Sequence, residues 1–246
     1  MIFKNGRSIQ TIRGADPKQL STAVQKLANE AEAAGNVADG GFAESSGTSS
    51  WVAVEPAKGY TNVTDQIDIK GLELLNFDGD LGNVRTLFDS KKPTALGDGK
   101  SSSKDWVESD TDDQLMLYVP FQSTLKVHSL QFTSIPSTSN DDEAPMRPKT
   151  VQIYTNRSHV LGFEEAEDTP STQSITLESR DWDTKTGTAK IDLRFVKFQN
   201  VSSLVIFVVN GDGEGEKVRL DRVRIIGETG EKRDPGKLEK MGDDHD

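Results

Sequence analysis

The sequence predicts a mainly β protein whose core is an antiparallel jelly-roll β-sandwich, and three observations support this class. From Trp51 onward, short strand-like runs recur with polar or Gly-containing breaks and without intervening helices, a pattern typical of antiparallel sandwiches. Ser203–Val209 is the longest uninterrupted apolar run and is bounded by Asn and Gly, which indicates a strand buried on both faces. Two further runs, Leu125–Phe132 and Val218–Ile226, change the parity of their apolar positions midway. Such a change indicates a β-bulge or a bend from one sheet into the other, which suits a jelly roll.

The N-terminal segment predicts a β-hairpin followed by a helix. Asn5-Gly6 lies between two short apolar or alternating runs and supplies the positive φ angles that a tight hairpin turn requires. A helix is predicted from Pro17 to about Ala33, because Asp16 can cap it and the apolar residues repeat at helical spacing. Two strands and one helix bury too little apolar area to offset the entropy of ordering them. We therefore expect a helix with a loose or displaced hairpin.

A linker, the sandwich and a tail follow this segment. Residues 34–58 are rich in Gly, Ala and Ser with scattered acids, which predicts a flexible linker. Residues 228–246 hold seven acids and four bases but few large apolar residues, which predicts a disordered charged tail. The predicted sandwich strands are Leu72–Leu75, Leu115–Val119, Leu125–Phe132, Thr150–Tyr154, Ser174–Leu177, Ile191–Phe198, Ser203–Val209 and Val218–Ile226.

Composition narrows the classes of partner and of chemistry. The 246 residues include 40 acids and 29 bases, and this acidic balance argues against general binding of nucleic acids or anionic membranes. A protein partner, with a basic surface, fits the charge better. The chain has no cysteine, which excludes disulfides, thiolate zinc sites and thiol catalysis within it. No run of about 18 apolar residues and no signal-peptide core are found, so we expect an intracellular protein.

Several ordered motifs resemble a known family. The strongest are VESDTDDQL from Val107, RFVKFQNV from Arg194 and SLVIFV from Ser203, with Gly59-Tyr60 and FEEA from Phe163 as further matches. Together they are similar to the PITH domain, the proteasome-interacting module that follows a thioredoxin domain in thioredoxin-like proteins. The resemblance implies a galactose-binding-like jelly roll over residues 59–227. It also implies a non-enzymatic, monomeric protein of the cytoplasm and nucleus that docks on the 26S proteasome regulatory particle.

The hairpin and helix of residues 1–33 resemble the final β-β-α element of a thioredoxin fold. FKNG, a following GAD and Pro17 carry this match. The redox Cys-x-x-Cys has no counterpart in the chain, so the resemblance implies no dithiol exchange. Met1 falls where that fold has the middle of a strand, and we therefore expect an N-terminally truncated product or a gene model begun too late.

Two segments are the candidate partner-binding sites. The first is the acidic motif before the strand at Leu115, where Ser109 and Asp110 can also accept backbone N–H groups in a turn. The second is the charged tail, in which His245 lies among aspartates at the chain end. The candidate residues are Glu108, Ser109, Asp110, Asp112, Asp113, Lys237, Lys240 and His245.

No cofactor or metal site is predicted. Gly99-Lys100-Ser101 is an incomplete phosphate-loop pattern and is interpreted as a loop. Asn210–Glu216 alternates oxygen-bearing residues with glycine but lacks EF-hand spacing, so a Gly-rich connection is preferred over a calcium site. His128 is expected to be a hydrogen-bonded core imidazole or, alternatively, an edge residue at a bulge.

Two other functions remain open at this point. The tryptophans and tyrosines could stack on a sugar ring, as in a carbohydrate-binding sandwich, although core or rim packing is the preferred role of such residues. A protein-disulfide oxidoreductase is the other alternative, and it requires a longer product that restores the missing cysteines.

Overall fold

A computed structural model describes residues 2–4, 7–10, 50–97, 104–137 and 144–229. The chain divides into two units, residues 1–47 and 48–246. In the first unit, β1 (Ile2–Lys4) and β2 (Arg7–Gln10) pair antiparallel, which confirms the predicted hairpin. The predicted helix that begins at Pro17 lies outside the described residues.

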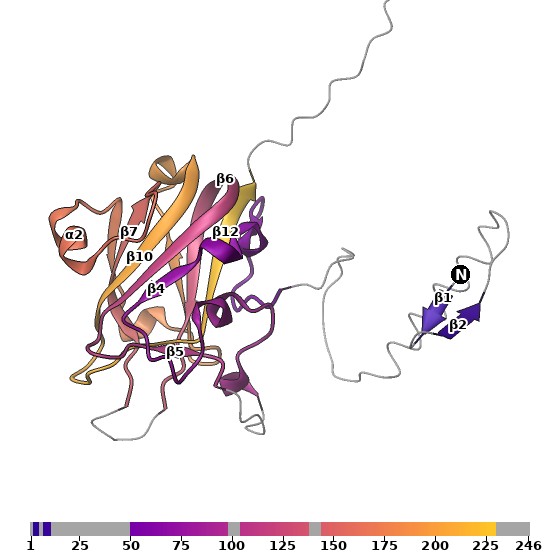
Figure 1. Ribbon diagram of the computed structural model, residues 1–246, viewed down its shortest axis with the longest axis horizontal. Coiled ribbons are helices and arrows are strands. Elements are labelled where there is room, and N and C mark those ends of the chain that lie inside the picture. The colour runs from indigo at the N-terminus through magenta and orange to yellow at the C-terminus, as the bar shows by residue number, and fades with distance from the viewer. Residues whose placement is uncertain (1, 5–6, 11–49, 98–103, 138–143, 230–246) are drawn as a thin grey trace, which may run out of the picture. The chain divides into compact units, whose positions relative to one another are not determined.

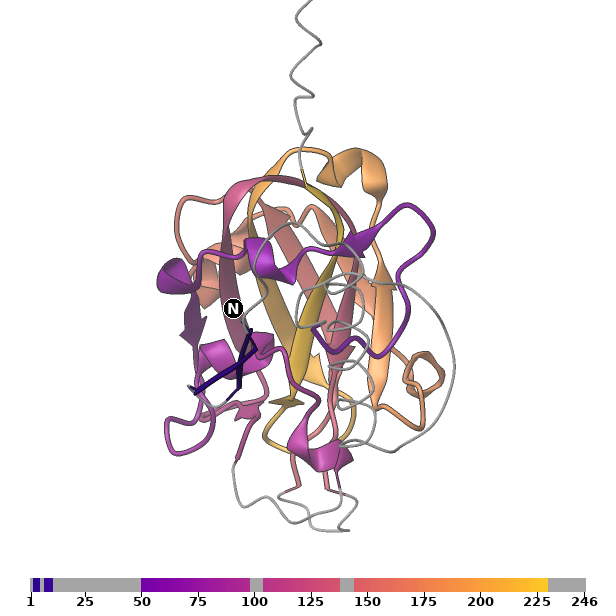
Figure 2. The same cartoon turned by 90° about the vertical axis from the view of Figure 1, so that its right-hand side faces the viewer.

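The second unit is an antiparallel β-sandwich whose two layers share one long strand (Figures 1 and 2). This strand, β6 (Leu115–Thr133), is 19 residues long. Its first half pairs with β10 and β4, and its second half pairs with β12 and β9. The mainly β, antiparallel jelly-roll class is thus confirmed. The remaining strands are β3 (Thr61–Asn62), β4 (Glu73–Leu75), β5 (Val107–Glu108), β7 (Pro148–Thr155), β8 (Gln173–Thr176), β9 (Thr188–Asp192), β10 (Val201–Gly211), β11 (Arg219–Leu220) and β12 (Arg222–Thr229).

Each layer has a simple strand order. The first layer runs β8, β7, β10, β6 and β4, and the second runs β3, β12, β6 and β9. A separate two-stranded ribbon joins β5 to β11. The helices are short: α2 (Phe163–Asp168), η1 (Thr64–Gln66), η2 (Ile69–Gly71), η3 (Val84–Phe88), η4 (Thr94–Leu96), η5 (Ser179–Asp181) and η6 (Phe195–Phe198), where η marks a 3-10 helix. Within the described residues, no helix is long and apolar enough to cross a membrane.

The central strand β10 has apolar side chains buried on both of its faces, as predicted. Leu204, Ile206 and Val208 point between the layers and join the main core. Val205 and Phe207 point outward into a second apolar cluster with residues from β6, β7 and α2. Because side chains alternate along a strand, one apolar run supplies both clusters. α2 therefore covers the outer face of the first layer (Figure 1).

Both predicted changes of parity correspond to bends of the chain. In β6 the register with β12 shifts between Ile226 and Gly227, which leaves His128 as the extra residue of a bulge. In the last predicted strand, the break at Asp221 separates β11 from β12, which belong to different sheets.

Three predicted boundaries are wrong. Leu115–Val119 and Leu125–Phe132 are two parts of β6, because the chain passes from one layer to the other without leaving extended conformation. Ile191–Phe198 is not one strand: β9 ends at Asp192 and η6 follows. Its alternating pattern instead reflects the three-residue period of a 3-10 helix, which puts Phe195 and Phe198 on one side.

Residues 51–58, which the sequence analysis placed in the linker, lie against the second layer. The amide of Gln131 on β6 donates to Val54 O (2.6 Å), and its oxygen accepts from Val54 N–H (3.2 Å). Trp51 N–H donates to Ser90 O (2.8 Å). These polar contacts attach the segment to the outer face of β6 and to the loop after η3.

Candidate functional site

The acidic turn, defined as residues 108–113, is held in place by hydrogen bonds within the domain. Ser109 is fully buried, its N–H donates to Val218 O (2.9 Å), and its Oγ accepts from Val218 N–H (3.0 Å). Ser109 is therefore an acceptor of a backbone N–H, as predicted, but the bond joins distant segments and does not close a local turn. The turn is thereby joined to Val218, which immediately precedes β11.

The carboxylates of the turn differ in their surroundings. Asp113 Oδ2 accepts from Gly211 N–H (2.9 Å), and Asp112 Oδ1 accepts from the N–H of Gln114 (3.0 Å). Asp112 Oδ1 also accepts from the amide of Asn76 (2.7 Å). Among the described contacts, it is therefore Asp112 and Asp113, not Asp110, whose carboxylates accept backbone N–H groups. Asp110 is exposed.

The structure does not bring all candidate residues together. The acidic turn precedes Leu115, which pairs with Val208 at one end of the sandwich. β12 ends at Thr229, which pairs with Leu125 at the opposite end of the layers. The tail candidates Lys237, Lys240 and His245 lie outside the described residues. The turn and the start of the tail are thus at opposite ends of the domain (Figure 1).

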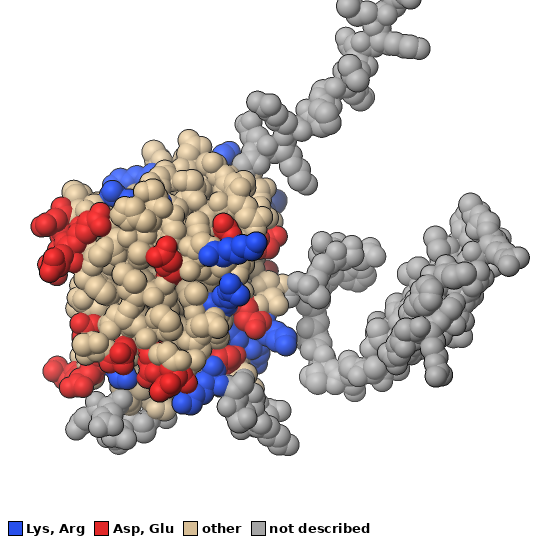
Figure 3. Space-filling view, in the orientation of Figure 1, with Lys and Arg blue, Asp and Glu red and all other residues tan. Residues whose placement is uncertain are grey.

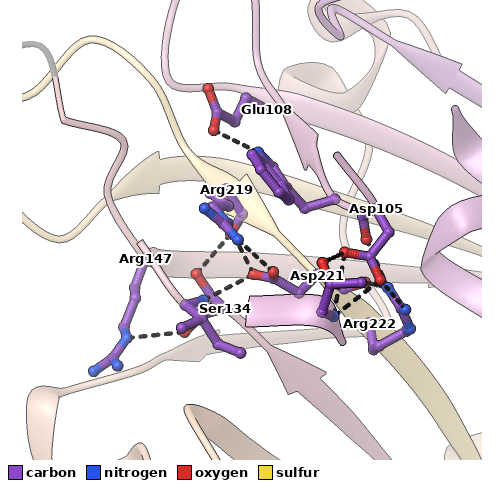
Figure 4. A network of polar contacts seen from close by, with 10 residues as sticks. Asp105, Glu108, Ser134, Arg147, Arg219, Asp221 and Arg222 are labelled. Carbon is purple, nitrogen blue, oxygen red and sulfur yellow. Dashed lines mark hydrogen bonds and ion pairs between the residues drawn. The ribbon is translucent and has the colours of Figure 1, made fainter. Parts of the chain in front are cut away.

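A cluster of buried arginines behind the acidic turn was missed by the sequence analysis. Arg219 forms a bidentate pair with Asp221, with Nη2 to Oδ1 at 2.7 Å and Nε to Oδ2 at 3.0 Å. The guanidinium of Arg219 lies 3.9 Å from the ring centroid of Trp106, whose indole N–H donates to Glu108 Oε1 (2.7 Å). Figure 4 shows this chain of contacts from the acidic turn to the strand. Glu108 therefore orients a tryptophan that covers a buried cation.

Arg222 is the second member, and it attaches the irregular segment before β5 to the sandwich. Its side chain is 1% exposed. Nη2 donates to Asp105 Oδ2 (2.5 Å), Nη1 donates to Asp105 O (2.7 Å), and Nε donates to Lys91 O (3.0 Å) (Figure 4). Burial raises the pKa of Asp105, but hydrogen bonds from Thr94 and Arg222 outweigh it and hold that pKa below its ordinary value. The pair is therefore ionised at neutral pH.

Arg224 is the third arginine of the cluster, and it binds backbone carbonyl groups in the N-terminal part of the domain. Its guanidinium donates to Trp51 O (2.7 Å), Leu87 O (3.3 Å) and Asp89 O. Burial, together with the nearby positive charge of Arg222, lowers the pKa of Arg224 to about 10. At neutral pH this side chain still carries its charge, which is shared among backbone carbonyls.

The arrangement performs a structural task rather than a chemical one. Val223 and Ile225 of β12 point into the core, whereas the alternating Arg222 and Arg224 point to the outer face of the second layer. There they bind carbonyl groups of the segments that cover this face. The guanidinium groups are occupied by acceptors of the domain itself, so the cluster is not free to bind an anion. Its sequence signal is the alternation of Arg with Val and Ile in a strand that is covered on both faces.

The tryptophans pack rather than form a stacking platform for a sugar. Trp51, Trp106 and Trp182 each lie beside a guanidinium, at ring-centroid distances of 5.9 Å, 3.9 Å and 5.3 Å respectively. Trp182 is 3% exposed, and its partner Arg147 donates through Nε to Ser134 O (3.2 Å). This matches the preferred interpretation of the large aromatic residues as core and rim packing.

His128 differs from the expected hydrogen-bonded core imidazole. It occupies the bulge of β6, where its ring stacks on Tyr60 with centroids 3.9 Å apart. Phe195 of η6 meets Tyr60 edge-on at 6.0 Å. The buried Nδ1 of His128 has no hydrogen-bond partner in the structure. Aromatic stacking at the bulge, and not a hydrogen bond, positions this imidazole.

The segment considered for calcium binding gives no assembled metal site within the described residues. Among the described residues, no group of three or more His, Asp or Glu side chains is placed to hold a metal ion. Asp212, in the Gly-rich connection, instead forms an ion pair with Lys149 (3.5 Å). The Gly99-Lys100-Ser101 loop lies outside the described residues.

Some solved structures share part of the architecture of this sandwich. The family 32 carbohydrate-binding module of C. perfringens NanJ, in complex with galactose, has a TM-score of 0.42 and 11% identity, and the match covers 68% of this chain and 98% of the module. A fucose-binding module of Streptococcus pneumoniae has a TM-score of 0.43 and 11% identity, with 71% and 100% covered. At these scores and identities the likeness assigns no ligand to this chain.

Comparison with known sequences identifies the family. The chain is 33% identical over 244 residues to Thioredoxin-like protein 1 of Schizosaccharomyces pombe, covering 98% of this chain and 72% of that protein. It is 28% identical over 167 residues to PITH domain-containing protein CG6153 of Drosophila melanogaster, covering 68% and 67%. The sequence profile of the PITH domain matches residues 53–243. The protein therefore belongs to the PITH domain family.

Proposed function

We propose that this protein is a non-enzymatic binding protein that docks through its PITH domain on the regulatory particle of the 26S proteasome, as a monomer in the cytoplasm and nucleus. The match of the PITH domain profile to residues 53–243 carries this proposal. The similarity to Thioredoxin-like protein 1 over nearly the whole chain supports it. The chain contributes no thiol chemistry of its own, because it has no cysteine.

The chemistry of the described residues supports binding rather than turnover. Asp105 and Arg224, whose pKa values are shifted, are engaged in holding the segments that lie on the outer face of the second layer. Groups that are locked into such contacts cannot change partners during a reaction cycle without loosening the fold.

The surface offers exposed carboxylates for a basic partner. Asp110 and Asp112 are exposed at the acidic turn, and Figure 3 shows acidic side chains gathered at that end of the domain and on the flank over α2. In the proposal, this end contacts basic groups of the regulatory particle. The tail, with Lys237, Lys240 and His245, supplies a second attachment that raises the overall affinity.

Co-purification tests this function. A tagged full-length chain is captured from cell lysate, and 26S subunits are quantified by mass spectrometry against an untagged control. We expect regulatory-particle subunits to be enriched, and deletion of Gly236–Asp246 to reduce their recovery. Unchanged recovery after the deletion would reject the role of the tail, and absence of proteasome subunits in every sample would reject the function.

A further inference from the structure

The short helix η6 presents an apolar side chain directly to solvent. Phe198 is fully buried in the main core, and Phe195, one 3-10 turn away, also faces the domain. Val196, between them, is 88% exposed. Among the described residues, Val196 and Ile69 (41%) are the large apolar side chains that are exposed. Val196 is therefore the most prominent apolar group on the described surface.

An aromatic floor, formed by Tyr60, His128 and Phe195, includes the residue that precedes this valine. Tyr60 stacks on His128, and Phe195 meets both rings, with centroids 6.0 Å and 6.2 Å away. All three residues are partly exposed. Partly exposed aromatic rings offer a partner contact area at a small cost in side-chain entropy. We call Tyr60, His128 and residues 194–197 the η6 surface.

The η6 surface is basic on a protein whose net charge is −11. Arg194 and Lys197 are exposed on either side of Val196. Lys197 Nζ donates to the backbone oxygen of Thr172 (3.0 Å). Within the described part of the chain, neither cation forms an ion pair. Two uncompensated positive charges around an exposed apolar group are complementary to an acidic segment that carries an apolar side chain.

The η6 surface lies at the end of the domain from which the tail continues. β10 begins at Val201, just after η6, and β12 ends at Thr229, and both of these residues pair with Leu125 of β6. Figure 1 shows β12 running to this end of the domain. In this end region of Figure 3, acidic side chains are sparse compared with the opposite end. A partner held by the tail is therefore brought close to the η6 surface.

We infer that the η6 surface is a docking site for an acidic segment of the protein partner, whose apolar side chain packs on Val196 and the aromatic floor. This inference rests on the proposed function, since it adds a second surface, at the end opposite the acidic turn, through which the domain meets the regulatory particle. The two exposed cations orient the segment by charge. Docking here and attachment of the tail occur at one end of the domain, so that each raises the effective concentration of the other contact.

Equilibrium binding of the full chain to purified 26S proteasome tests this inference. The variants are Val196→Ser and the charge reversal Arg194→Glu with Lys197→Glu. The matched control is Ile69→Ser with Lys70→Glu, which changes an exposed apolar residue and a neighbouring cation on η2. All changed side chains are solvent-exposed, so thermal midpoints are expected to stay near that of the original chain.

We expect Val196→Ser to raise the Kd by roughly tenfold, as for a central interface residue. The charge reversal is expected to weaken binding at least as much at low salt, with a smaller loss at high salt. The control is expected to change the Kd by less than about twofold.

Three results would overturn the inference, and they are distinguishable. If the original chain binds and the η6 variants bind like the control, the docking surface is elsewhere and the proposed function stands. If the charge reversal tightens binding, the segment at this surface is basic and not acidic. If the original chain itself does not bind the 26S proteasome, the proposed function fails and this inference fails with it.

Discussion

Replacing Arg222 by Met should destabilise the domain strongly, because the change breaks a buried ion pair and leaves the acceptors of Arg222 without a hydrogen-bond donor. Met retains much of the length of the side chain, so the lost groups are mainly the N–H donors. Those donors contact Asp105 Oδ2 and three backbone carbonyls, of Lys91, Asp105 and Asp221. Removing one partner of a buried pair costs about 3–5 kcal/mol, because the remaining charge is left uncompensated. For a domain of this size we expect a fall in Tm of roughly 6–20 °C.

Urea denaturation followed by tryptophan fluorescence measures this loss of unfolding free energy. The matched control is Lys190→Met, which breaks the ion pair with Asp192 (2.8 Å) between side chains that are 35% and 68% exposed. Exposed pairs contribute about 0–1 kcal/mol, so the control should change little. If Arg222→Met loses less than about 1 kcal/mol of unfolding free energy, as the control does, the arginine cluster does not hold the segments on the outer face of the second layer, and that conclusion is refuted.

Three further predictions concern other positions. Ser109→Ala should cost about 1–3 kcal/mol because it leaves a buried backbone N–H unpaired, whereas the exposed Asp110→Ala should cost under about 0.5 kcal/mol; equal losses in urea melts would contradict this. In the folded protein the pKa of Asp105 is lowered from its ordinary value of 3.8. The stabilisation that ionised Asp105 contributes is therefore fully present above the ordinary pKa, and it is lost as the pH falls through the lower folded-state pKa. The stability gap between the original chain and Asp105→Asn should therefore narrow from pH 7 to about pH 3, and a constant gap would refute the assignment. Gly227→Ala should destabilise the bulge, since its Cβ would lie 2.1 Å from Lys126 O, and an unchanged midpoint in a thermal melt would show that the backbone can yield there.

Much of the sandwich could be predicted from its apolar residues, because burial fixes their periodicity. The run in β10 indicated a strand covered on both faces, and the parity changes located the bulge at His128 and the break at Asp221. The apolar pattern could not predict that β6 is a single strand that passes from one layer to the other. Residues 122–124 there are polar and exposed, as in a loop, yet they remain extended because both flanking halves are fixed in separate layers.

The polar interior was harder to predict because its partners are distant in sequence. Arg224 binds the carbonyl of Trp51 across 173 positions, and no local pattern identifies such an acceptor. Composition alone therefore places Trp51 in the linker. Ser109 was predictable as an acceptor of a backbone N–H, but its partner Val218, 109 positions away, was not. The exposure of Val196 could not be predicted, because the alternating motif fits a strand as well as a 3-10 helix.

Cross-linking of the native complex, followed by mass spectrometry, tests the central claim most directly. The claim is that the PITH domain itself contacts the regulatory particle, and that the η6 surface is part of this contact. Lysine-reactive cross-linker is added to 26S proteasome purified with the tagged full chain. The account predicts cross-links from Lys197 and Lys126 to a regulatory-particle subunit. Cross-links confined to the proteolytic core particle, or to none of the proteasome subunits, would contradict it.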